Sequence, residues 1–165
     1  MDYNKPNHDH LEIKALEVLE AYGITKPVVN VSAIAKKEGY AIKEIKMPVG
    51  SENVAGFYDR DRKTIYINAE DAPDKKLFSI AHELGHIFLE HPTYGVLYRI
   101  PKKGTEEYPI QESEANSFAA YLLMPRFMVR EYLEKYRLSR NDYRTMAEIF
   151  GVPMSAMKYQ LEYLK

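Results

Sequence analysis

The chain has 165 residues, contains no cysteine, and carries 23 Lys and Arg against 24 Asp and Glu, for a net charge of -1. The lack of cysteine excludes disulfides, a thiol nucleophile, an iron–sulfur cluster and cysteine-ligated zinc, and the balanced charge disfavours a strongly basic nucleic-acid binder. Because the N-terminus is polar and no apolar run approaches the roughly 20 residues that span a bilayer, we expect a soluble, cytoplasmic protein with no membrane contact.

The first predicted elements are two helices and a strand. Apolar residues at helical spacing predict a helix over residues 9–22. Asn30 or Ser32 is a candidate N-cap for a short second helix that runs through Lys37. Residues 40–45 alternate in polarity, which predicts a β-strand.

A predicted β-hairpin comes next, followed by a long helix. Residues 54–58 and 64–68 have the composition of strands, and the charged residues between them predict a turn. The long helix is predicted from Asp71 to about His91, where Pro92 ends it.

The second half begins with residues 92–110, which hold three prolines and two glycines and predict a long loop. A helix is predicted over residues 110–123, where a proline interrupts it. The remainder, residues 126–165, is predicted to be helical, with breaks at 139–141 and 151–153.

The long helix contains the motif His82-Glu83-Leu84-Gly85-His86, an HExxH pattern. Two histidines four residues apart differ by about 40° around an α-helix and about 6 Å along it, so both imidazoles can reach one metal ion. Glu83 lies about 100° from His82, where it can take a proton from metal-bound water without occupying a coordination position. The alternative is an amphipathic helix with two incidental histidines, but an unpaired buried His-Glu-His set would be costly.

A catalytic zinc site needs a third protein ligand beside the two motif histidines. An extended HExxHxxGxxH motif is excluded, because Leu89 replaces its glycine and Pro92 its third histidine. His91 falls on the opposite side of the predicted helix, so we expect a surface histidine. His8 and His10 lie near the terminus and are poor candidates.

The next helix supplies candidate carboxylates in Glu112 and Glu114. They lie about 200° apart around a helix, so only one can face the metal. We select Glu112, with Asn116 one turn further as a partner that orients a ligand histidine. The alternative is that both glutamates are solvated first-turn residues favoured by the helix dipole.

These motifs together resemble the ImmA/IrrE family of metallopeptidases, over roughly residues 30–160. The resemblance rests on His82–His86, Glu112–Ala120, Leu122–Pro125, and the hairpin residues Gly56–Tyr58 and Ile65–Asn68. The combination is far more specific than an HExxH motif alone.

The resemblance implies a compact, zincin-like α+β fold with a small antiparallel sheet and the HExxH helix at the active site. It implies His82, His86 and Glu112 as metal ligands and Glu83 as general base. Members of the family cut a helix-turn-helix repressor at one site and so derepress mobile-element or stress genes. The length of the chain favours the short type linked to phage or mobile elements.

The expected chemistry is that of a zinc peptidase, although Mn²⁺ or Fe²⁺ could occupy the same ligands. Bound Zn²⁺ lowers the pKa of water towards about 7, and Glu83 moves the proton to the leaving amine. Tyr94, Tyr98 and Tyr121 are candidate donors to the oxyanion. The strand Thr64-Ile65-Tyr66-Ile67-Asn68 either pairs with an extended substrate or is an ordinary sheet edge.

We expect a metallopeptidase core over residues 1–123 and a C-terminal helical subdomain over 124–165. Residues 143–152 resemble the first helix and turn of a helix-turn-helix, and 154–164 would be its second helix. Residues 124–165 carry only eight Lys and Arg against five Asp and Glu, so we expect this subdomain to dock a repressor rather than bind DNA.

Two other functions stay open at this point. One is a non-catalytic anti-repressor or antitoxin that keeps the fold and sequesters a partner, although pure binding has no need of Glu83. The other is a DNA-binding regulator that uses the C-terminal helices, which steep salt dependence of binding would support.

Overall fold

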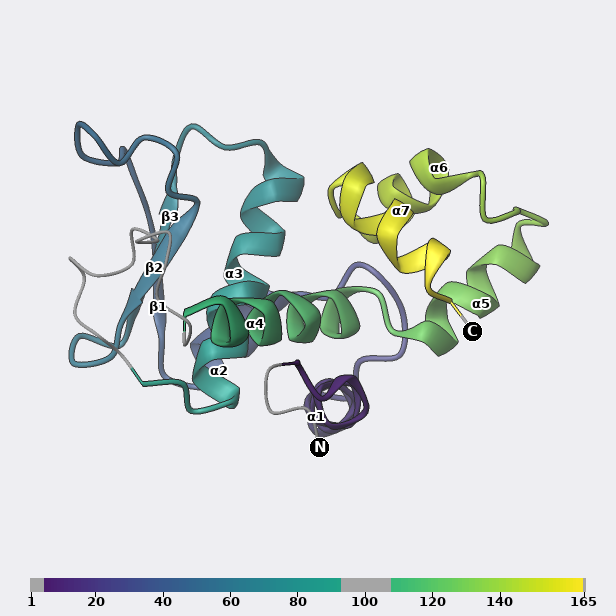
Figure 1. Cartoon of the computed structure of the whole chain (residues 1–165), viewed down its shortest axis with the longest axis horizontal. Helices are drawn as coiled ribbons and strands as arrows, with labels where there is room; N and C mark the ends of the chain where they lie inside the picture. Colours follow the sequence, from purple (N-terminus) through teal and green to yellow (C-terminus); the bar gives the residue numbers. More distant parts are fainter. Residues whose placement is uncertain (1–4, 93–107, 165) are drawn as a thin grey trace.

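The computed structural model describes residues 5–92 and 108–164, and within them the chain forms seven helices and a three-stranded sheet (Figure 1). In chain order these are α1 (His8–Ala21), α2 (Val31–Lys37), β1 (Ala41–Ile45), β2 (Gly56–Asp59), β3 (Thr64–Asn68), α3 (Pro73–Phe88), α4 (Tyr108–Leu123), α5 (Arg126–Lys135), α6 (Tyr143–Phe150) and α7 (Met154–Glu162). The mixed α and β content expected from the sequence is confirmed. No helix in the described ranges is long and apolar enough to cross a bilayer.

The helix ends follow local capping chemistry. Asn30 is the N-cap of α2, and its side-chain oxygen accepts a hydrogen bond from the Ala33 N–H at 3.0 Å, so Ser32 is not the cap. Helix α3 ends at Phe88, three residues before the predicted end, because Glu90 adopts a left-handed conformation with φ 54°. The chain therefore leaves the helix before it reaches His91.

The sheet is mixed, which corrects the expectation of an antiparallel sheet. Its order is β1-β3-β2, with the predicted hairpin pairing β2 antiparallel to β3, while β1 runs parallel to β3. The segment between β1 and β2 crosses to the far side of β3 and reverses direction. The hairpin then reverses the chain again, so β1 and β3 point the same way.

This topology makes β3 the central strand, which corrects a second expectation. Both sides of Thr64–Asn68 are hydrogen-bonded, one to β1 and the other to β2. The strand is therefore neither a sheet edge nor able to pair its backbone with a substrate. Its side chains instead enter the core, where Ile65 and Ile67 have no exposed surface.

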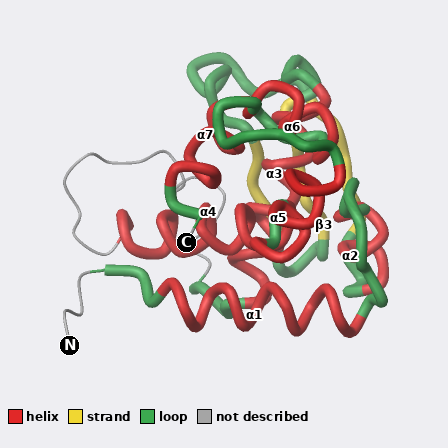
Figure 2. Tube along the Cα trace, turned by 90° about the vertical axis from the view of Figure 1, so that its right-hand side faces the viewer, coloured by secondary structure: helices red, strands yellow, loops and turns green. Residues whose placement is uncertain are grey.

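One buried core extends from α1 to α7, and α3 crosses α4 within it beside the sheet (Figure 1). Leu84 of α3 and Phe118 of α4 are fully buried there. A Cβ added to Gly85 would lie 3.0 Å from both the Cα and the carbonyl oxygen of Ala115. Glycine at this position of α3 therefore permits the close approach of the two helices. Figure 2 shows α1 running alongside α4.

The C-terminal helices are fixed to the rest of the chain by specific contacts. The side-chain amide of Gln160 in α7 donates to the Met124 carbonyl oxygen at 2.9 Å. Gly151 ends α6 with φ 66°, and a Cβ there would lie 3.1 Å from a methyl group of Val28. The predicted breaks at 139–141 and 151–153 fall between helices. The division at residue 124 into core and subdomain stays a prediction.

Candidate metal centre and active-site cleft

Three side chains from α3 and α4 point at one another. His82 Nε2 lies 3.0 Å from one carboxylate oxygen of Glu112, and His86 Nε2 lies 3.1 Å from the other. The two Nε2 atoms are 3.1 Å apart, and one ligand atom from each residue lies within 4.8 Å of the others. Two imidazoles and one carboxylate are the ligands of many catalytic zinc sites, so this group could hold one metal ion.

The helix geometry explains why these residues meet. The two histidines lie one turn apart on the same side of α3, as their spacing predicts. Gly85 lies between them, at the point where α3 touches Ala115 of α4. Glu112 precedes Ala115 by about one turn, so the close crossing of the helices brings its carboxylate to the histidines.

The charges of this group are mutually stabilising. Burial alone would lower the pKa of His82, but its hydrogen bond to Glu112 and the nearby carboxylates of Glu83 and Glu112 raise the pKa above its usual value. Burial alone would raise the pKa of Glu112, but hydrogen bonds and charge from His82 and His86 hold the pKa far below its usual range. The site therefore favours a positive charge between these residues, which a metal ion would also supply.

The outer nitrogens of the two histidines have different partners. His82 Nδ1 lies 2.9 Å from the Asn116 side-chain oxygen, so Asn116 is located where the sequence predicts a partner. His86 Nδ1 lies 2.9 Å from His91 Nδ1, and His91 Nε2 lies 3.0 Å from a carboxylate oxygen of Glu114. Glu114 is thus paired with a histidine rather than solvated.

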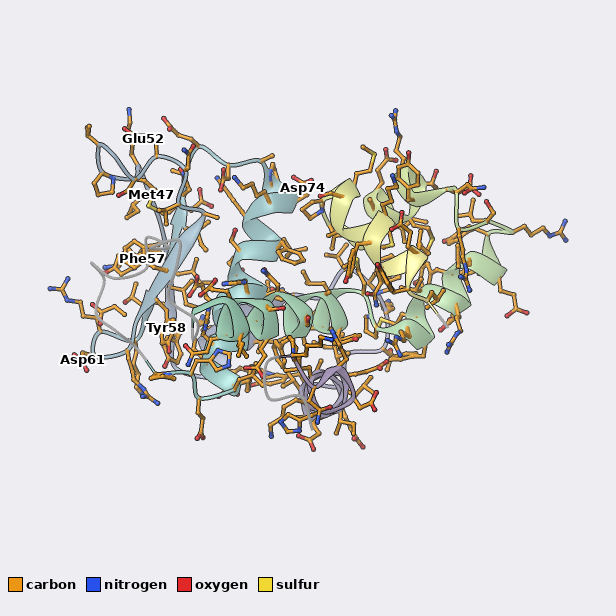
Figure 3. All side chains as sticks on the ribbon, in the orientation of Figure 1. Met47, Glu52, Phe57, Tyr58, Asp61 and Asp74 are labelled. Carbon is orange, nitrogen blue, oxygen red and sulfur yellow. The ribbon has the colours of Figure 1, made fainter. Side chains whose placement is uncertain are left out.

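His91 is buried, with 6% of its surface exposed, so the expectation of a surface histidine is wrong. That expectation continued the helix through residue 91, whereas α3 ends at Phe88. The turn after the helix directs His91 back beneath His86. Tyr58 of β2 also lies here (Figure 3), with its hydroxyl donating to the His91 carbonyl oxygen at 3.4 Å and its ring stacked 6.3 Å from that of His86.

Beside the ligand group lies a cleft of about 570 Å³. Its lining includes His82, Glu83, Glu112 and Asn116, together with residues 50, 51 and 53–55 ahead of β2 and Gly56 at its start. Glu83 is buried, and a Cβ on Gly56 would lie 3.9 Å from one of its carboxylate oxygens. The predicted general base and two of the three candidate ligands, His82 and Glu112, therefore line one cavity, while His86 lies behind them in contact with both ligands.

The lining of the cleft also includes Pro153, from the turn between α6 and α7. The sequence gives no local signal for this contact, because Pro153 is about seventy positions from His82 and reads as a helix breaker. Tyr121, a candidate oxyanion donor, does not line the cleft; its hydroxyl lies 3.2 Å from His8 Nδ1. Tyr94 and Tyr98 lie outside the described residues.

Comparison with known proteins places these features in a family. A peptidase family model described as the IrrE N-terminal-like domain matches residues 37–162. The radiation response metalloprotease IrrE of Deinococcus radiodurans is 27% identical over 124 residues, which are 70% of this chain and 35% of that protein. Uncharacterized immunity region protein 2 of Bacillus phage phi105 is 35% identical over 83 residues, 48% of this chain and 50% of that protein.

A solved structure described as a Mycobacterium tuberculosis transcriptional regulator has a similar fold. It superposes with a TM-score of 0.74 at 17% identity and covers 98% of this chain, while the chain covers 58% of that protein. At this identity the likeness shows a common fold and no more.

The family match covers most of the chain, so the chain belongs to the peptidases with an IrrE N-terminal-like domain. The resemblance found in the sequence is thereby confirmed. The chain spans about a third of one curated relative and half of the other, so the activity of those whole proteins does not by itself define what this chain does.

Proposed function

We propose that the chain is a zinc-dependent, site-specific endopeptidase that cleaves a helix-turn-helix transcriptional repressor and so derepresses mobile-element or stress genes. The observation that carries the proposal is the convergence of His82, His86 and Glu112 at the edge of a cleft that the buried residue Glu83 also lines. Relatives named as a radiation response metalloprotease and a phage immunity region protein support a protease in a regulatory setting. Such a substrate places the protein in the cytoplasm.

The donor set fits zinc, because two neutral imidazoles and one carboxylate leave a position for water or substrate. When bound, the ion supplies Lewis acidity, which acidifies water and polarises the scissile carbonyl. Glu83 accepts the proton of the attacking water and donates it to the leaving amine. Asn116 Oδ1 accepts a hydrogen bond from His82 Nδ1–H and so directs Nε2 of that ring towards the carboxylate of Glu112.

The substrate would bind along β2 rather than β3. Among the residues that the structure describes, β2 pairs with β3 on one side only, and its first residue Gly56 lines the cleft together with Val54 and Ala55 ahead of it. An extended peptide could add to such an edge by backbone hydrogen bonds. The apolar lining residues Val54, Phe78 and Pro153 would then contact its side chains.

The C-terminal helices would contribute to substrate recognition. Pro153 brings the turn between α6 and α7 into the cleft wall, next to where the peptide would lie. With eight basic and five acidic residues from 124 to 165, this region lacks the charge excess of a DNA-binding surface. We therefore expect it to contact a protein partner.

Elemental analysis and a cleavage assay test the proposal together. Purified protein should contain about one equivalent of zinc, and both His82→Ala and Glu112→Ala should lose it. The loaded protein should cut a helix-turn-helix repressor encoded beside it at one bond, whereas Glu83→Gln should retain zinc and cut about 10²-fold to 10⁴-fold more slowly. Derepression by Glu83→Gln equal to that of the unaltered protein would instead support a non-catalytic anti-repressor.

A further inference from the structure

A hydrogen-bonded chain of three side chains runs outward from His86 to Glu114. His86 Nδ1 lies 2.9 Å from His91 Nδ1, and His91 Nε2 lies 3.0 Å from Glu114 Oε2. The His86 and His91 side chains are 6% and 8% exposed, and that of Glu114 is 28% exposed. Two rings and a carboxylate from α3, the following turn and α4 are thus joined at one place.

The backbone after α3 creates this chain. The Glu90 N–H donates to the Ile87 carbonyl at 3.2 Å, and the His91 N–H donates to the His86 carbonyl at 3.0 Å. With Glu90 in the left-handed region, these two bonds form a Schellman motif. The motif brings His91, five positions after His86, back beside the His86 side chain. In many Schellman motifs the residue at this position is apolar and makes a hydrophobic contact with the helix. Here a histidine occupies that position.

The direction of each hydrogen bond follows from the inward nitrogen of His86. In the zinc-bound protein of the proposed function, Nε2 of His86 is the ligand nitrogen and carries no proton, so the proton of the neutral ring is on Nδ1, which donates to His91 Nδ1. His91 then accepts at Nδ1 and must carry its own proton on Nε2. That N–H donates to the carboxylate of Glu114.

The two histidines of the ligand group are therefore held differently. His82 donates to the neutral amide oxygen of Asn116, a side chain that accepts but carries no charge. His86 donates to a histidine that is in turn held by a carboxylate, and the ring of Tyr58 stacks on it. Partners of this kind fix the tautomer and orientation of a ligand ring and raise its basicity.

We propose that His91 and Glu114 are positioning residues that hold His86 with Nε2 directed at the metal. The inference rests on the metal site of the proposed function and adds to it two residues that are not ligands. Their removal should weaken metal binding by about 10-fold to 100-fold while all three ligands remain.

Metal affinity of the full chain tests this directly. The Zn²⁺ dissociation constant would be measured by chelator competition for the unaltered protein, His91→Leu, Glu114→Ala and His91→Gln. The first two should bind zinc 10-fold to 100-fold more weakly, and His91→Gln should recover most of the loss, because its amide can both accept from His86 and donate to Glu114. The visible spectrum of bound Co²⁺ should change in the first two variants and be restored in the third.

Glu12→Ala is the matched control. Glu12 forms an ion pair with Arg126 at 3.0 Å and its side chain is 22% exposed, so it resembles Glu114 in burial and pairing but has no contact with the hydrogen-bonded chain that ends at His86. It should bind zinc as tightly as the unaltered protein. Thermal unfolding of the metal-free forms would separate a loss of affinity from a loss of fold.

Four outcomes would overturn the inference, and they are distinguishable from one another. If the unaltered protein binds zinc but His91→Leu and Glu114→Ala bind it within about twofold as tightly, the positioning role is wrong and the proposed function stands. If the unaltered protein binds no zinc, both the positioning role and the proposed function are wrong. An equal loss of affinity in Glu12→Ala, or no recovery in His91→Gln, would show general destabilisation instead.

Discussion

Two regions of the molecule meet at the cleft, and they are built differently. The α3–α4 crossing contains the candidate ligands, and its polar side chains are joined by hydrogen bonds between 2.9 and 3.1 Å. The turn between α6 and α7 contributes Pro153, which has no side-chain hydrogen bond to offer. The crossing therefore positions the side chains of the proposed chemistry, whereas the turn forms part of the cleft wall.

The largest effect should come from Glu83→Gln at the crossing. Removing the general base should lower the cleavage rate by about 10²-fold to 10⁴-fold, while zinc content stays at one equivalent. The rate would be measured on the repressor by gel electrophoresis or mass spectrometry, with zinc determined on the same samples. A variant that cuts at an unchanged rate would remove Glu83 from the mechanism.

Gly85→Ala should damage the fold and the metal site together. The added methyl group would lie 3.0 Å from the Ala115 backbone, so α3 and α4 must move apart and Glu112 must move with α4. We expect a loss of about 1–3 kcal/mol in the free energy of unfolding and weaker zinc binding. Denaturant unfolding and chelator competition measure the two effects, and unchanged zinc affinity would contradict the account of the crossing.

Gly151→Ala is the counterpart in the other region. Its φ of 66° disfavours a side chain, and the methyl group would lie 3.1 Å from Val28. We expect a loss of about 1–2 kcal/mol in the free energy of unfolding, but zinc affinity within twofold of the original. If zinc binding fell as far as in Gly85→Ala, the two regions would not be separable.

The metal-free protein should show a pH-dependent contribution from the His82–Glu112 pair. Glu112 has a lowered pKa in the folded chain, so its contribution is present above its usual value of 4.5 and is lost as the pH falls through the lower folded value. His82 has a raised pKa, so its contribution is present below 6.5 and is lost as the pH rises through the higher folded value. The difference in melting temperature between the unaltered protein and Glu112→Gln should therefore be largest between pH 4.5 and 6.5. A difference that grew towards pH 8 would contradict the pairing.

The smallest effect should come from Pro153→Ala in the turn. Its ring lines the cleft but holds no ligand, so KM for the repressor should change by a few-fold, while zinc affinity and cleavage of a short peptide stay the same. Steady-state kinetics on the two substrates measure the difference. An equal change for both would place Pro153 nearer to the chemistry than the geometry indicates.

Local patterns in the sequence predicted the parts of this protein that depend on near neighbours. The spacing of His82 and His86 follows from the helical repeat, and the hairpin and the Asn30 cap follow from residues a few positions apart. The choice of Glu112 over Glu114 also began from helix geometry, and the structure brings Glu112 to both histidines. The family followed from the combination of these motifs.

The tertiary structure decided what depends on contacts between distant segments. Strand β3 became central only because the chain crosses over it before forming β2, which no local pattern of Thr64–Asn68 encodes. His91 became the partner of His86 because a left-handed residue ended α3 early, and a non-glycine residue at that position gives little warning. Pro153 reached the cleft through packing of the C-terminal helices. Sequence periodicity determines which side of a helix or strand a residue occupies. Helix crossings, turns and packing determine which residues of distant segments that side contacts.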